Sequence, residues 1–158
     1  LTSQKDFPTL LRSFSILRKK ELCKLVILGE GELLSELKEL TKQLQISEDV
    51  YFPGFVENPY SWMKHSKLFV LSSAYEGLPN ALIQAMACGT RVISTDCPTG
   101  PMEILESGKW GKLVSVGNDK ELAQAMIASF REEHNTDVFK RASYFSTERA
   151  ITSYKRLI

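Results

Sequence analysis

The chain alternates short apolar runs with longer stretches in which apolar residues recur every three or four positions. The short runs are typical of strands buried on both faces of a parallel sheet, and they cover residues 23–29, 50–52, 67–72, 91–95 and 111–116. The periodic stretches are typical of amphipathic helices, and they cover residues 7–17, 31–44, 58–65, 79–88, 101–106 and 119–132, with two more near the C-terminus. This alternation predicts an α/β fold, with a parallel sheet of five or six strands, helices on both faces, and Gly29, Ser72 and Thr95 near one edge.

The segment from Glu76 to Gly89 is the one around which we expect the chain to be organised. It follows a buried strand and contains a helix, from about Pro79 to Cys88, whose only polar residues before Cys88 are Asn80 and Gln84, on one face. A helix that is otherwise apolar all round is buried, so this polar stripe is expected to pair inside the protein or to line a cavity. Glu76 lies just before the helix, beside backbone N–H groups that have no helical partner. In an open α/β sheet this is where an anionic ligand binds, and we predict an active site here.

Helix-start signals and single charged residues leave several interpretations open. Asp6 and Asp119 are expected to cap helices, and Pro79 is expected in a first helical turn. Glu76 alone is equally typical of a charge that stabilises a helix N-terminus by about 0.3–1 kcal/mol. Lys5 alone is typical of a solvated lysine. Two acidic residues flank a loop rich in proline and glycine, where either one could line the same crevice or cap a helix; they are Asp96 and Glu103.

Gly29-Glu30-Gly31 is only part of a dinucleotide-binding fingerprint, because the third glycine is replaced by Leu34. The better interpretation is a tight turn between strand and helix that lets a ligand approach the backbone.

Composition indicates one ordinary globular domain, and we treat residues 1–158 as a single unit. A net charge of +1 gives no argument for nucleic acid as a partner. No apolar run has membrane-spanning length, and the start lacks a signal-peptide pattern. The three cysteines are widely spaced and form neither a metal-ligand pair nor a disulfide framework, so a reducing, cytoplasmic setting is expected. His65 and His134 are expected to be ordinary surface residues.

Taken together, these segments resemble the nucleotide-sugar-binding half of family-four retaining glycosyltransferases of the bacterial polysaccharide type. In that family two Rossmann-like domains face each other across a cleft, and the likeness covers almost the whole chain. Lys5 stands in the place of the lysine that holds the donor diphosphate. The resemblance also implies that two turns contact the uracil, through the pairs Gly29–Glu30 and Phe55–Val56.

The resemblance assigns the segment after residue 75 to the donor as well. Glu76 and position 84 match the family's hallmark pair of acidic residues, which implies that Glu76 touches the transferred sugar. Amides around Asn80 and Ala81, in a loop and helix that include Gly77 and Leu78, would receive phosphate oxygens. The second acidic position here is Gln84, which can accept a ribose hydroxyl only without charge assistance.

The implied function is transfer of a sugar from a UDP-sugar to a saccharide or lipid-linked acceptor. No metal cofactor is expected, because Lys5 and a helix N-terminus can stabilise the leaving diphosphate and the chain has no Asp-x-Asp motif. The acceptor-binding N-terminal half and an upstream arginine are absent, so the chain is expected to bind donor without transferring sugar. The resemblance is compatible with peripheral association of the full-length protein at the inner face of the membrane. Two alternatives stay open, namely a sugar-nucleotide epimerase or hydrolase on the same plan and a non-catalytic nucleotide-sugar sensor.

Overall fold

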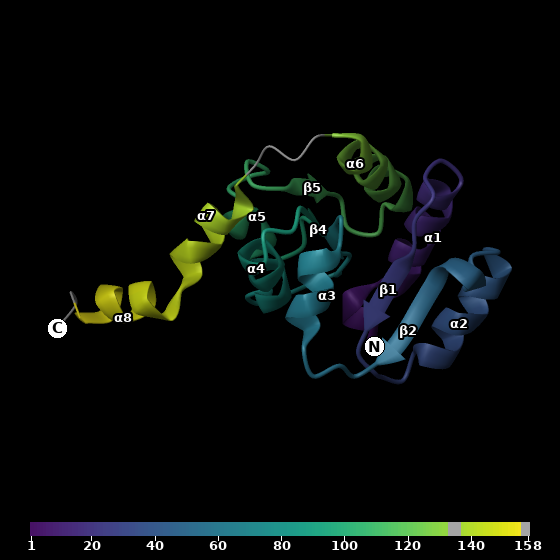
Figure 1. Ribbon diagram of the computed structural model, residues 1–158, viewed down its shortest axis with the longest axis horizontal. Coiled ribbons are helices and arrows are strands. Elements are labelled where there is room, and N and C mark those ends of the chain that lie inside the picture. The colour runs from purple at the N-terminus through teal and green to yellow at the C-terminus, as the bar shows by residue number, and fades with distance from the viewer. Residues whose placement is uncertain (133–136, 156–158) are drawn as a thin grey trace.

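The computed structural model describes residues 1–132 and 137–155, and it confirms an α/β fold with parallel strands (Figure 1). His134 and Leu157 therefore lie outside the described residues. The elements are, in order, α1 (Phe7–Arg18), β1 (Leu25–Leu28), α2 (Leu34–Gln43), β2 (Val50–Gly54), α3 (Pro59–His65), β3 (Phe69–Leu71), α4 (Asn80–Ala87), β4 (Val92–Thr95), α5 (Pro101–Ile104), β5 (Lys112–Val114), α6 (Asp119–Arg131), α7 (Val138–Ala142) and α8 (Thr147–Lys155). Within these residues no helix is long and apolar enough to cross a membrane.

The strands pair differently from the single sheet that the sequence predicts. The five described strands form two hydrogen-bonded sets, in the orders β1-β2 and β3-β4-β5, and every pairing is parallel. No ladder joins β1 to β3 among the described residues. The two sets are held together by side-chain packing instead, because Ile27 of β1, Val50 of β2 and Ile93 of β4 belong to one buried cluster.

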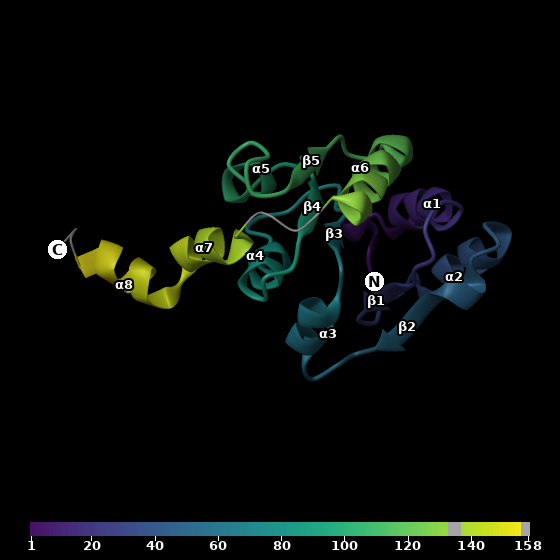
Figure 2. The same cartoon turned by 45° about the horizontal axis from the view of Figure 1, so that its top comes forward.

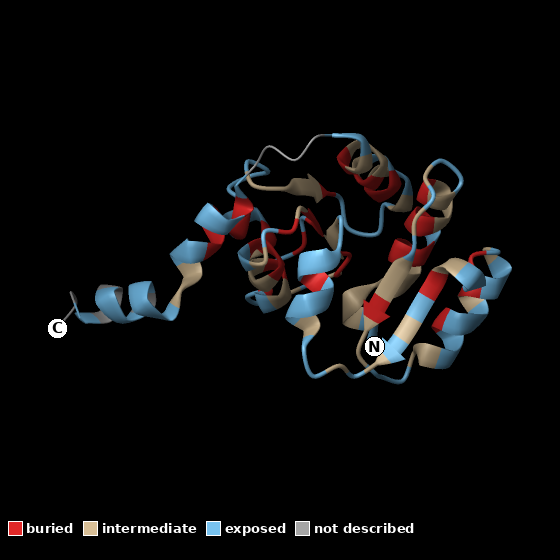
Figure 3. Cartoon of the chain, viewed as in Figure 1, coloured by how far each residue is buried: buried red, intermediate tan, exposed pale blue. Residues whose placement is uncertain are grey.

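Helices cover both faces of the three-stranded set, as predicted. Successive residues of a strand point to opposite faces. Ile93 accordingly packs into the cluster built by α1, α2 and α6, whereas its neighbour Val92 packs into a second cluster with α4, α5 and α7. The side-by-side packing of α1 and α6 is visible in Figure 2. Residues with buried side chains concentrate where these helices meet the strands, while α8 extends away from the rest of the chain and is mostly exposed (Figure 3).

Local signals explain most helix ends, with two corrections. Asp6 caps α1 as predicted, since its carboxylate accepts from the Thr9 N–H at 3.3 Å. The cap of α6 is Asn118 rather than Asp119, because the Asn118 side chain accepts from the Glu121 N–H at 3.1 Å. Pro79 occupies the N-cap position of α4 and not its first turn, as its ψ of 81° is not helical.

Candidate functional site

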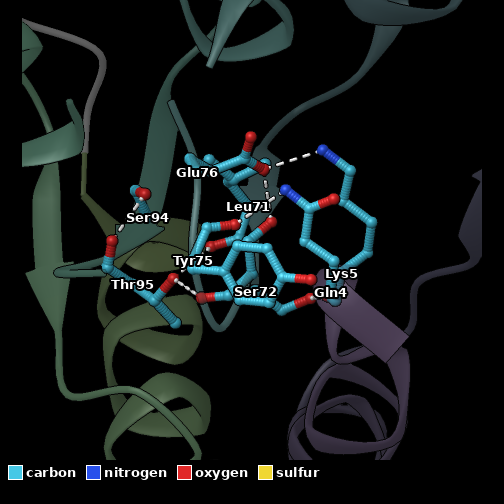
Figure 4. Close-up of polar contacts among 9 residues, drawn as sticks. Gln4, Lys5, Leu71, Ser72, Tyr75, Glu76, Ser94 and Thr95 are labelled. Atoms are coloured by element: carbon cyan, nitrogen blue, oxygen red, sulfur yellow. Dashed lines mark hydrogen bonds and ion pairs between the residues drawn. The ribbon is translucent and has the colours of Figure 1, made fainter. Parts of the chain in front are cut away.

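The centre of the site is a direct contact between Lys5 and Glu76, the two residues that the resemblance singled out as catalytic. Lys5 ends a short 3₁₀ turn (Ser3–Lys5), and its Nζ donates to Glu76 Oε1 at 2.7 Å (Figure 4). The Glu76 side chain is 7% exposed and the Lys5 side chain 39%. The fold therefore joins an N-terminal cation to a shielded carboxylate in the loop between β3 and α4.

Three further hydrogen bonds hold Glu76 in place. Ser73 Oγ donates to the same carboxylate oxygen at 2.6 Å. The Glu76 backbone N–H donates to the Pro98 carbonyl at 2.8 Å, and the Thr99 N–H donates to the Glu76 carbonyl at 2.9 Å. Glu76 is thus held by its side chain from within its own loop and by its backbone from the loop after β4.

The N-terminal segment that carries Lys5 is fastened to the loop after β3. Ser72 Oγ donates to the Lys5 carbonyl at 2.7 Å, and the Ala74 N–H donates to the Gln4 carbonyl at 2.8 Å. The Gln4 side-chain amide donates to the Tyr75 carbonyl at 3.0 Å (Figure 4). These bonds fix the position of the Lys5 backbone relative to the loop, so that the Lys5 side chain can reach the Glu76 carboxylate.

The loop after β4 is itself packed tightly against the segment that leads into α4. Gly100 has a φ of +100°, and a Cβ at this position would lie 2.6 Å from the Gly77 carbonyl oxygen and 2.7 Å from Pro79 Cδ. No side chain larger than hydrogen fits there without a shift of the backbone. The glycine thereby lets the two loops meet behind Glu76.

Arg141 of α7 anchors α5, the short helix that follows this loop. Its Nε donates to the Ile104 carbonyl at 2.8 Å and its Nη2 to the Glu103 carbonyl at 2.7 Å, which satisfies carbonyls at the end of α5. The residue is only 8% exposed, and an ion pair with Glu106 at 2.9 Å compensates its charge. The C-terminal part of the chain therefore supports the loop that supports Glu76.

The N-terminus of α4, where the sequence predicts that an anion binds, is exposed, but two of its first-turn amides are already bonded. Gly77, Leu78 and Asn80 are exposed, and amides in a first helical turn have no intrahelical partner. The Asn80 and Leu82 N–H groups, however, already donate to preceding carbonyls, at 2.8 Å and 2.9 Å. An arriving phosphate would therefore have Ala81 as the nearer available amide of the first turn.

The polar stripe of α4 is not buried, which corrects the expectation for this helix. Asn80 is exposed and Gln84 is half-buried, and neither side chain forms a hydrogen bond with a described residue. Leu82, Ala85 and Met86 supply the buried face. The expectation failed because an apolar pattern does not require full burial: Ala81 and Ile83 are only half-buried, so one side of the helix faces outward.

The two turns assigned to the nucleobase lie together. The Gly29 N–H donates to the Gly54 carbonyl at 2.8 Å, so the turns that follow β1 and β2 are bonded to each other. Glu30 is exposed, Phe55 is 76% exposed, and Val56 is half-buried. The close approach expected at Gly31 is made by the chain's own Leu1 backbone, which leaves no room for a side chain there.

The N-terminal segment bridges these turns and the Lys5–Glu76 pair. The Leu1 amino group donates to the Glu30 carbonyl, and the Leu33 N–H donates to the Leu1 carbonyl at 3.3 Å. No described contact joins Phe55 directly to Glu76. The residues assigned to the donor therefore form two groups, one at the β1 and β2 turns and one at Glu76, and residues 1–5 run between them.

The remaining candidates play no visible part in the site. Asp96 and Glu103 are exposed, and the N-cap of α5 is Gly100, so Asp96 does not cap that helix. Burial raises the pKa of the Cys97 thiol, and the nearby Glu76 charge acts in the same direction, which disfavours a reactive thiolate. His65 is exposed, as predicted, and the three cysteines are free.

Sequence patterns gave no role to Ser73 or Gln4, and they placed Thr95 near the sheet edge without its link to the loop after β3. Thr95 Oγ1 donates to the Ser73 carbonyl at 2.6 Å, which ties β4 to the same loop. The available signal was a pair of serines directly after an apolar strand, a place where polar groups meet at the sheet edge.

Comparison with known proteins places the chain in a family. The model for "Glycosyl transferases group 1" matches residues 1–145. The chain belongs to this glycosyltransferase family. An uncharacterised glycosyltransferase of Methanocaldococcus jannaschii is 36% identical over 192 aligned positions, covering 100% of this chain and 47% of the relative. A Campylobacter jejuni N-acetylgalactosamine-N,N'-diacetylbacillosaminyl-diphospho-undecaprenol 4-alpha-N-acetylgalactosaminyltransferase is 35% identical over 140 residues, covering 89% of this chain and 38% of the relative.

Solved structures share the fold at lower identity. A Staphylococcus aureus TarM mutant in complex with Fondaparinux, alpha-GlcNAc-glycerol and UDP has a TM-score of 0.88 at 22% identity, covering 99% of this chain and 33% of that one. Anabaena HepE in complex with UDP has a TM-score of 0.84 at 20% identity. The match covers 99% of this chain and 45% of HepE. The Rossmann-like fold of this family is therefore confirmed, and the chain spans less than half the length of these relatives.

Proposed function

We propose that this group 1 glycosyltransferase chain binds the donor, a UDP-sugar, at the carboxyl edge of its strands. The observation that carries the proposal is the Lys5–Glu76 pair beside the open N-terminus of α4. A cation and a helix N-terminus suit a diphosphate, and a shielded carboxylate at the same place suits the sugar that the diphosphate carries. The TarM and HepE structures are complexes with UDP, which supports uridine as the nucleoside.

The proposed chemistry follows from where charge develops. As the sugar leaves the diphosphate, negative charge grows on the phosphate and the sugar becomes oxocarbenium-like. Lys5 and the α4 amides would stabilise the phosphate, and Glu76 would orient the sugar or stabilise its positive charge. Gln84 would accept a hydrogen bond from the ribose, and Phe55 with the Gly29–Glu30 turn would contact the uracil.

For a longer protein that carries this chain, we propose retaining transfer to a saccharide or lipid-linked acceptor in polysaccharide synthesis. The diphospho-undecaprenol in the name of the Campylobacter relative, and a Salmonella typhi relative named for Vi polysaccharide biosynthesis, support this acceptor class. The 158-residue chain by itself is expected to transfer no sugar. A non-catalytic nucleotide-sugar sensor is the second candidate, because the neutral Gln84 replaces an acidic residue of the family's pair.

The test is calorimetric titration of the chain with UDP, GDP and ADP, with and without EDTA. UDP is expected to bind most tightly, more weakly as salt rises, and equally well after chelation. Lys5→Gln should weaken UDP by roughly 5- to 10-fold, since a charge-assisted bond to phosphate is lost. Lys20→Gln removes the same charge from an exposed residue just beyond the C-terminal end of α1 and should change little. Tighter binding of GDP or ADP would refute the uridine assignment, and loss of UDP binding in EDTA would refute phosphate stabilisation by Lys5 and α4.

A further inference from the structure

The Glu76 carboxylate is held by one of its two oxygens only. Oε1 accepts from both Lys5 Nζ, at 2.7 Å, and Ser73 Oγ, at 2.6 Å. No described residue donates to Oε2, and Figure 4 shows this oxygen turned away from Lys5. One oxygen is therefore committed to the protein and the other is available to a ligand.

The serine is better fixed than the lysine. Ser73 is 0% exposed, and its carbonyl accepts from Thr95 Oγ1 at 2.6 Å, which ties it to β4. Lys5 is 39% exposed and reaches the carboxylate through a long flexible side chain. If a diphosphate recruits Lys5, the Ser73 hydroxyl is the side-chain contact that still orients Glu76.

We propose that Ser73 is a positioning residue, which turns the Glu76 carboxylate so that Oε2 faces the sugar of the bound donor. The inference rests on the proposed function and deepens it, because it gives the two carboxylate oxygens different tasks. A hydroxyl that needed only a partner could use a backbone carbonyl, as Ser94 does by donating to the Thr95 carbonyl at 2.8 Å. Ser73 instead donates to a carboxylate, where a hydrogen bond is roughly twice as strong and sets the direction of a charged group.

The experiment is a double-mutant cycle on this chain with Ser73→Ala and Glu76→Ala. Affinities are measured by calorimetry for UDP and for four probes, which are UDP-glucose, UDP-galactose, UDP-N-acetylglucosamine and UDP-N-acetylgalactosamine. For the best sugar nucleotide, Ser73→Ala should lower affinity roughly 3- to 10-fold while UDP affinity changes by less than about 2-fold. In the Glu76→Ala background, Ser73→Ala should have no further effect on the sugar nucleotide.

Two variants separate positioning from structural support. Ser94→Ala removes a serine that is equally buried on the adjacent strand and does not contact Glu76, so it should alter neither affinity. Ser73→Cys leaves no cavity and donates only weakly, so it should reproduce the selective loss even if Ser73→Ala is unstable. Equal weakening of UDP and UDP-sugar, or additive losses in the double mutant, would overturn the positioning role. Failure of the unmodified chain to bind any of the five nucleotides would instead refute the proposed function.

Discussion

Glu76 and a bound diphosphate would compete for the same lysine, so removal of the Glu76 charge should strengthen nucleotide binding. Glu76→Gln is the suitable change, because an amide oxygen can still accept from Ser73 while the negative charge is lost. Lys5 is then released from its ion pair at 2.7 Å and is available to phosphate. The variant also removes repulsion between a carboxylate and the arriving anion.

The size of the effect follows from the exposure of the two partners. Because the Lys5 side chain is 39% exposed, the ion pair belongs with surface pairs, which contribute about 0.2–1 kcal/mol. The shielding of Glu76, at 7% exposed, places the pair toward the upper end of that range. Glu76→Gln should therefore tighten UDP by about 2- to 5-fold, and the gain should shrink as salt rises.

The assay is calorimetry with UDP at about 20 mM and about 300 mM salt, where the Debye lengths differ several-fold. Glu103→Gln is the matched control, because it removes the same charge from an exposed residue of α5 that has no ion pair among the described contacts. UDP binding that becomes weaker in Glu76→Gln would refute the competition, since it would mean that the carboxylate holds Lys5 in the position that phosphate needs.

Two further predictions concern other parts of the chain. Gln84→Glu should tighten UDP binding by roughly 2- to 10-fold through a charge-assisted hydrogen bond to the ribose. Position 84 is half-buried and its side chain has no described hydrogen bond, so the charge should not lower the melting temperature. A lower melting temperature with no gain in affinity would refute the ribose assignment. Hydrogen bonding from Lys24 lowers the pKa of Asp49 from its ordinary value of 3.8, so Asp49 stabilises the fold above that pH and loses this effect as pH falls through the lower folded value. Chemical denaturation should therefore give Asp49→Asn a lower free energy of unfolding than the unmodified chain at neutral pH, and the difference should disappear below about pH 3.8. A difference in unfolding free energy that does not vary with pH would contradict this prediction.

Patterns that depend on neighbours in sequence predicted the elements well. Apolar runs located all five described strands, and Asp6 located the start of α1, because burial and capping act over a few residues. The pairing of the strands could not be predicted from such patterns. Whether β1 bonds to β3 depends on what lies between them, and periodicity within each strand carries no information about that.

Some residues of the candidate site were likewise predictable from local sequence, whereas others depend on contacts between distant parts of the chain. The sequence indicated Glu76 before a helix N-terminus, and the resemblance added Lys5. Neither the sequence pattern nor the resemblance revealed Ser73. This residue lies beyond the last residue of β3, where the alternation of side chains along a strand no longer predicts which way a side chain points. The direction of Ser73 depends on Thr95, and the backbone of Glu76 depends on Pro98 and Thr99, which are distant in sequence.

The hydrogen bonds from Arg141 to the end of α5 bear on when the site becomes ordered during synthesis of the chain. Synthesis delivers Lys5 first, Glu76 midway and Arg141 late, while the loop that fixes the Glu76 backbone leads into α5, whose last carbonyls Arg141 binds. During translation the cation and the carboxylate can already meet, but the loop behind them lacks its last anchor until α7 has left the ribosome. The backbone around Glu76 therefore gains its full support only after α7 is made, although Lys5 and Glu76 are present early.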